Sequence, residues 1–217
     1  MKTTFLKITA LVAFVAFSSC KEKAEEAETK AAEEAAVAKA TAVTYKADVE
    51  NSSIIWKGFK PTGSHEGTIN IKEGSVAVND GAVESGNFII DMASIAVTDI
   101  PVEDEGNANL QGHLSGEDFF DVEKFPTAKF EVTGLETKDG KTMLSGNLKM
   151  KDATNNVSFP VTTSIDGDKM TLKSETFVID RSKWNIKYGS KSFFDDLGDK
   201  FINDDIELTV NLVAKKS

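Results

Sequence analysis

The stretch that decides the fold is Ile206–Lys215, which reads IELTVNLVAK. Apolar side chains occupy every second position from Ile206 to Ala214, and the positions between them are mostly polar. Successive side chains of a β-strand point to opposite faces, so a period of two is typical of an antiparallel strand with one buried and one wet face. The C-terminal part of the chain is therefore predicted to be such a strand.

The same alternation recurs through the preceding residues, and turn signals separate the runs. Hairpin turns are expected at Asn79-Asp80-Gly81, Lys138-Asp139-Gly140 and Asp166-Gly167-Asp168. Pro160 cannot donate a backbone hydrogen bond, so it predicts an edge or a bulge. Eight strands are predicted, at residues 45–59, 66–79, 82–95, 127–137, 141–151, 155–166, 169–181 and 204–215. Strands in this meander order favour an all-β fold, an antiparallel barrel or a sandwich.

Two stretches lack the alternation, residues 98–121 and 182–203. Loops of this length are usually functional or contain short helices. We expect one short helix over residues 109–119 and a second over residues 192–197.

The first nineteen residues resemble a secretory signal peptide. A short basic start precedes an apolar run from Ile8 to Phe17, which is too short to cross a bilayer. Ser18 and Ser19 then lead into Cys20, the one cysteine of the chain, in a pattern that resembles a bacterial lipobox. We expect Cys20 to be acylated, which would anchor the protein to a membrane of the cell envelope, with the outer membrane as the expected one. The alternative is an ordinary signal peptide that leaves a free thiol.

Residues 20–43 are rich in Ala, Glu and Lys, which are strong helix formers. They contain no apolar stripe, so the sequence predicts a partly helical spacer that does not pack on the domain. The domain itself is expected over residues 44–217. Lys21–Glu26 loosely resembles the charged export signals of some Bacteroidetes lipoproteins, without deciding the membrane face.

The charge of the chain limits its partners. The formal net charge is −10, and a chain beginning at Cys20 would lack Lys2 and Lys7 and carry −12. Nucleic acid binding requires clustered Lys and Arg, so this acidity argues against a nucleic acid partner. It also argues against electrostatic attraction to anionic lipid.

Three side chains are candidates for polar chemistry. His65 and His113 are the only histidines, and they serve either as metal ligands or, as we expect, as hydrogen-bonding groups that fix loops. Arg181 is the only arginine. It either clamps a ligand phosphate or carboxylate, or forms a buried pair with Asp118 or Asp121. No metal site, no cofactor and no catalytic nucleophile is predicted, so we do not expect an enzyme.

One segment, Gly112–Pro126, reads GHLSGEDFFDVEKFP and resembles the signature of the YceI-like family. Supporting pieces occur in the family's order at Trp56–Gly58, His65–Gly67, Ser145–Leu148 and Asp180–Ile186. The resemblance implies an eight-stranded lipocalin-like barrel whose members are associated with polyisoprenoid or other amphiphilic ligands. Members of the family often dimerise, so it also implies a homodimer as one partner to test.

The leading hypothesis is therefore a lipid-anchored barrel that binds a hydrophobic or isoprenoid-like molecule in its interior. A barrel filled by its own side chains, acting as a partner-binding or stress-related envelope module, is the second. A hydrolase or isomerase acting on a lipid is the third, and it requires an acid–base pair in the cavity. The residues expected to bind the ligand are Phe119, Phe120, Phe130, Phe159 and Trp184 as lining, with Arg181 or His113 near a head group.

Overall fold

The computed structural model describes residues 24–217. The predicted signal peptide and the predicted acylation of Cys20 lie outside these residues. Within them, no helix is both long enough and apolar enough to cross a membrane.

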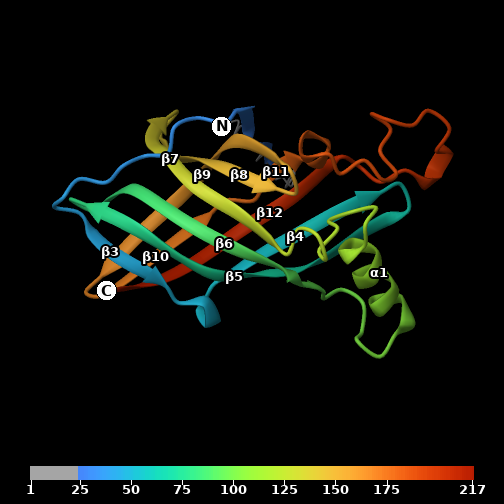
Figure 1. Cartoon of the computed structure of the whole chain (residues 1–217), viewed down its shortest axis with the longest axis horizontal. Helices are drawn as coiled ribbons and strands as arrows, with labels where there is room; N and C mark the ends of the chain where they lie inside the picture. Colours follow the sequence, from blue (N-terminus) through green and yellow to red (C-terminus); the bar gives the residue numbers. More distant parts are fainter. Residues whose placement is uncertain (1–23) are drawn as a thin grey trace, which may run out of the picture.

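Eight strands form a ring, which confirms the predicted all-β class and antiparallel meander (Figure 1). Each ring strand pairs antiparallel with its sequence neighbour, and β12 pairs with both β10 and β4 to complete the ring. The ring consists of β4 (Ser53–Lys60), β5 (Gly63–Asn79), β6 (Ala82–Val97), β7 (Thr127–Lys138), β8 (Lys141–Met150), β9 (Ala153–Asp166), β10 (Lys169–Ser174) and β12 (Asp205–Lys216).

Two of the predicted strands are each divided in two. Residues 45–59 form β3 (Val43–Ala47) and β4, separated by the short 3-10 helix η1 (Val49–Asn51), and both halves pair with β12 and β5. Residues 169–181 form β10 and β11 (Phe177–Asp180), which pair one after the other with β12.

The turn predictions are confirmed by the backbone. Asp80-Gly81 and Asp139-Gly140 have positive φ at both positions, as tight hairpin turns require, and Gly167 also has positive φ. Pro160 lies where β9 changes partner, because β10 pairs with β9 from Val161 onward. Its missing N–H therefore falls at a local strand edge, as predicted.

The helix predictions are partly wrong. The first helix is α1 (Glu105–Ser115), which begins four residues earlier than expected because the Asp104 side chain accepts a hydrogen bond from the Gly106 N–H and caps it. Residues 192–197 form turns rather than a helix. Ser190 and Ser192 hydrogen-bond to the Asp204 carboxylate there, which holds the backbone in a non-helical course.

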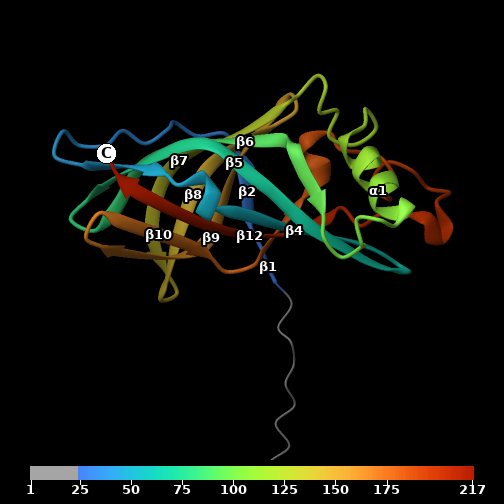
Figure 2. The same ribbon diagram turned by 90° about the horizontal axis from the view of Figure 1, so that it is seen from below.

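The predicted unpacked, partly helical spacer is wrong for its described part, residues 24–42. These residues, here called the N-terminal segment, are extended and cross the outside of the barrel (Figures 1 and 2). β1 (Glu25–Glu26) pairs parallel with β11, and β2 (Glu28–Ala31) pairs antiparallel with β9. The segment thus fills the gap in the wall that opens where β10 ends and β11 begins, and Ala27 is buried in it.

Short polar side chains on the outer face of the wall bind this segment. The Asn147 amide donates to the Glu33 carbonyl at 2.7 Å and accepts from the Glu33 N–H at 3.0 Å, as a neighbouring strand would. Asn156 supports it by donating to Asn147 Oδ1 at 3.1 Å and to Thr133 Oγ1 at 2.8 Å. Asn147 and Asn156 are buried as a result. Backbone hydrogen bonds outweigh helix propensity here, so the N-terminal segment packs on the barrel instead of forming a free spacer.

Replacing Asn147 with Ala should therefore destabilise the protein by about 1–3 kcal/mol, because it leaves the Glu33 backbone groups and Asn156 without their partner. Urea unfolding measures the change, and hydrogen exchange should rise in residues 24–36. Asn87→Ala is the matched control, since Asn87 is exposed on β6, two strands away from β8. Unchanged exchange in the Asn147 variant would contradict the docking of the segment.

Candidate ligand cavity

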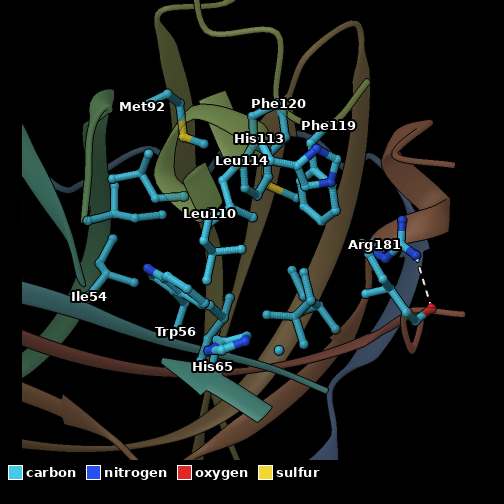
Figure 3. Close-up of a pocket in the computed structure, with 18 of the residues that line it drawn as sticks. Ile54, Trp56, His65, Met92, Leu110, His113, Leu114, Phe119, Phe120 and Arg181 are labelled. Carbon is cyan, nitrogen blue, oxygen red and sulfur yellow. Dashed lines mark hydrogen bonds between the residues drawn. The ribbon is translucent and has the colours of Figure 1, made fainter. Parts of the chain in front are cut away.

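One end of the barrel is hollow. A cavity of about 560 Å³ lies between the ring and the elements that cover this end, α1 and the residues after it. Figure 3 shows Trp56 and His65 on one side of it, facing Leu110 and Leu114 of α1 on the other. Its apolar lining from the strands comprises Ile54, Trp56, Phe59, Ile69, Ile90, Met92, Ile95, Ala128, Leu148, Met150, Ile179, Ile206 and Leu208.

A layer of phenylalanine side chains lies deeper in the barrel, beneath the residues that line the cavity. Phe130 lies 5.9 Å from Phe159, which stacks on Phe177 at 4.1 Å, the distances being between ring centroids. Phe88 belongs to the same layer, since it pairs with Phe130 across β6 and β7. Gly146 makes room for the layer, because a Cβ there would lie 2.3 Å from the Phe130 ring.

Beyond this aromatic layer the barrel is filled by its own side chains. Buried residues such as Val132, Leu144, Val161 and Leu212 belong to the core there, and none of them lines the cavity. On the other side of the aromatic layer, the inward-facing residues line the cavity. Ala128 lies two residues before Phe130 on β7, and Ile179 lies two residues after Phe177 on β11. The two hypotheses of a hollow and a filled barrel thus each describe one half of the molecule.

The cap of the hollow end comes from the Gly112–Pro126 segment. The Phe120 N–H donates to the Leu114 carbonyl, and the Asp121 N–H donates to the Gly116 carbonyl, so the chain folds back beneath α1. Asp121 has a φ of 51°, which this reversal requires. Phe119 and Phe120 are consequently buried against each other at 5.0 Å, and both line the cavity.

A few polar side chains also line the cavity. Among them are the half-buried His65 and His113 and the exposed Lys60, which come from β5, α1 and β4. His65 Nδ1 lies 2.9 Å from Asp99 Oδ2, while His113 packs edge-on against Phe119 and Tyr188. Burial raises the pKa of Asp99, but hydrogen bonds from the Glu66 N–H and from His65 outweigh it and hold that pKa below its ordinary value.

The geometry around the histidines does not form a nucleophilic or a metal centre within the described residues. Among residues 24–217, no three His, Cys, Asp or Glu side chains lie close enough to share a metal ion. No hydroxyl of this part of the chain hydrogen-bonds to either histidine. Both histidines line the cavity, where a lipid-modifying enzyme would require its acid–base pair, so that third hypothesis stays a prediction.

Arg181 serves as a clamp on the loop that precedes β12. It lies in the 3-10 helix η2 (Arg181–Trp184) and is fully buried. Its guanidinium donates to three backbone carbonyls, at 3.1 Å to Asn203, 2.6 Å to Ile186 and 3.1 Å to Ile202. Asp204 lies 3.3 Å away, so the acidic partner is this residue and not Asp118 or Asp121 as expected.

Burial lowers the pKa of Arg181, and the charges of Asp204 and Asp180 oppose that effect. Its guanidinium also lies over the Phe119 ring at 5.3 Å, which links the loop clamp to the cap of the cavity. Most of its N–H donors are occupied by the protein's own carbonyls. This favours a buried structural pair over a clamp on a ligand phosphate or carboxylate.

The structure brings together only some of the residues expected to bind a ligand. Phe119, Phe120, His113 and Arg181 line the cavity. Phe130 and Phe159 belong to the aromatic layer beneath it. Trp184 is fully buried, donates from Nε1 to the Leu148 carbonyl at 2.8 Å, and is not part of the cavity wall.

Trp56 is the main lining residue that the prediction missed. Its ring lies against Gly67, where a Cβ would be only 2.7 Å from the indole, and its buried Nε1 has no hydrogen-bond partner. The Trp56–Gly58 and His65–Gly67 pieces of the motif pattern pointed to this site, since both lie on β4 and β5 at the hollow end.

A ring of eight antiparallel strands around an apolar cavity defines the class of small β-barrels that enclose one ligand-sized space. The model of the YceI-like domain family matches residues 45–214. The chain belongs to the YceI-like family.

Two solved structures show the same fold. BcnA of Burkholderia cenocepacia superposes with a TM-score of 0.62 at 23% identity, over 78% of this chain and 99% of that one. A polyisoprenoid binding domain from Saccharophagus degradans, implicated in plant cell wall breakdown, gives 0.57 at 12% identity, over 81% and 99%. A comparison with curated proteins gave no match.

Replacing Arg181 with Met should destabilise the protein by about 3–5 kcal/mol, because it leaves the partly buried Asp204 without its cation and three carbonyls without their donor. A second change, Asp204→Asn, should recover part of this loss in urea unfolding. Lys215→Met, which removes the exposed partner of Asp48, is the control and should have little effect. If Arg181→Met and Lys215→Met lowered the free energy of unfolding equally, the role of Arg181 as a clamp would be contradicted.

Proposed function

We propose that this protein binds a hydrophobic or amphiphilic, isoprenoid-like molecule in the hollow half of its barrel. The observation that carries the proposal is the cavity of about 560 Å³ with an almost wholly apolar wall. Pockets that bury small ligands have volumes of roughly 300–1,000 Å³, so the space suits one such molecule. The polyisoprenoid binding of the Saccharophagus relative gives the class of ligand to test first.

The energetics favour an apolar chain as the occupant. Burying apolar surface contributes about 25 cal/mol per Å², and a bound chain would contact apolar side chains from the strands and from α1. A void of this size in a core would otherwise lose the dispersion contacts that close packing supplies.

The polar side chains that line the cavity are suited to a head group. His65, His113 and Lys60 are among them, and each has hydrogen-bonding capacity that the apolar wall lacks. Arg181 has most of its donors committed to the protein, so we assign the head group to His113 and its neighbours rather than to Arg181.

We further propose that the protein is held at an envelope membrane, the outer membrane being the expected one, by acyl chains on Cys20. Cys20 precedes the docked residue Glu25 by five positions, a span of at most about 18 Å in an extended chain. The docking of the N-terminal segment on β9 and β11 therefore supports a barrel that stays close to the lipid surface. Binding without chemical conversion, and a homodimer as partner, remain predictions.

Filling the cavity should abolish ligand uptake without unfolding the barrel. Ala128 lines the cavity, so Ala128→Phe places a ring in the space that the ligand would occupy. All-trans-retinol, a fluorescent isoprenoid alcohol that quenches nearby tryptophan, is the probe. We expect it to quench Trp56 in the wild-type protein and not in this variant.

Ala93→Phe is the matched control, because Ala93 is exposed on the outer face of β6 next to the lining residue Met92. Native mass spectrometry of the Ala24–Ser217 protein, purified without detergent, should show a bound lipid in the wild type and the control. An empty wild-type protein that takes up no retinol would favour a partner-binding module instead.

A further inference from the structure

Large aromatic side chains are exposed beside the cavity. They belong to residues 186–203, here called the mouth loop, which contains the short 3-10 helix η3 (Gly198–Lys200) and projects from the same end of the barrel as α1 (Figure 1). Tyr188, Phe193 and Phe194 have exposed fractions of 45%, 45% and 49%. Clustered exposed apolar side chains on a soluble domain mark a surface that contacts something else.

The exposure does not result from a loosely held loop. Arg181 binds the carbonyls of Ile186 and Ile202, which lie at the two ends of the loop. Ser190 and Ser192 donate to Asp204 at 2.8 and 2.6 Å, and the Phe194 N–H donates to the Ser190 carbonyl. The backbone is thus fixed so that the aromatic rings point away from the core.

The mouth loop is continuous with the cavity. Tyr188 contacts His113 with ring centroids 4.5 Å apart, and His113 lines the cavity. Ile202 also lines it, and the Ile202 N–H donates to the Gly189 carbonyl. Before α1, Val102 is 84% exposed close to the lining residue Ile100, so apolar side chains occur on two segments around the mouth.

The charges of the loop favour a lipid surface over a protein. Lys187 lies over Phe193 at 4.9 Å, and Lys191 lies over the Phe201 ring at 3.6 Å. Lysine is depleted from the centre of protein interfaces, whereas lysine beside phenylalanine is typical of segments at a membrane surface. Three lysines and three aspartates leave the mouth loop without net charge, which suits electrically neutral lipid.

We propose that the mouth loop docks on a neutral lipid bilayer through Phe193, Phe194 and Tyr188, placing the opening of the cavity at the lipid surface. An apolar chain then passes between bilayer and cavity without crossing water, a transfer step that rests on the proposed function. Docking itself requires no ligand, so the two can be tested apart.

The test uses Phe193→Trp in the Ala24–Ser217 protein, which lacks Cys20 and so carries no acyl chain. The two natural tryptophans are buried, Trp56 being 7% and Trp184 0% exposed, so the added one reports on the loop. Vesicles of brominated phosphatidylcholine should quench its emission and shift it to shorter wavelength. Ile165→Trp, at the 38% exposed position near the opposite end of the barrel, is the control and should not respond. Equal responses of the two tryptophans, or none, would overturn the proposal and leave a protein as the partner of the loop.

A second variant, Phe193→Ser with Phe194→Ser, tests the consequence. Removing two exposed rings should weaken vesicle association by roughly tenfold or more. Retinol transfer from protein to vesicles should slow, while retinol affinity in solution stays unchanged. If Phe193→Trp inserts but the wild type takes up no retinol, the docking surface stands and the proposed ligand is wrong. If retinol binds and the double variant associates and transfers normally, the binding function stands and the docking surface is wrong.

Discussion

The pairing of β12 along both of its edges is the constraint on which the rest of the structure depends. β10 and β11 pair with one edge of this strand, and β3 and β4 pair with the other. The first and last strands of the meander are thereby joined, and every apolar face turns toward one interior. At one end, the side chains do not fill that interior. The positions of the large side chains therefore decide which part of the barrel is filled and which part is hollow.

The aromatic layer makes that division. Phenylalanines on adjacent strands meet in the middle of the barrel, and Gly146 provides the space for the Phe130 ring. Smaller lining residues such as Ala128 leave the far side hollow. Arg181 then fixes the mouth, since one guanidinium contacts the mouth loop, Asp204 and the ring of Phe119 in the cap.

The N-terminal segment and the mouth loop are the two parts of the barrel on which the proposed attachment to a membrane depends. The segment is bound to the wall through Asn147 and fills the gap between β9 and β11, so a lipid on Cys20 would hold the barrel close rather than on a long spacer. The mouth loop presents aromatic rings next to the cavity. Under the two proposals together, the barrel would exchange an apolar ligand with the bilayer to which Cys20 anchors it.

The sequence by itself determined the class of fold, because alternation and hairpin turns are local properties: the run from Ile206 to Ala214 and the Asp139-Gly140 turn predict their own structure. The Gly112–Pro126 motif likewise predicted the family, which the match over residues 45–214 confirms. Only the tertiary structure decided which inward side chains meet the cavity, since Phe130 and Ala128 share one face of one strand and differ only in their depth in the barrel. It also decided the course of residues 24–42, where helix-forming residues become extended because distant Asn147 offers the backbone its hydrogen bonds. The acidic partner of Arg181 could not be predicted from the sequence either, because any of several acids could pair with it. Only the packing of the chain brings Asp204 close to it.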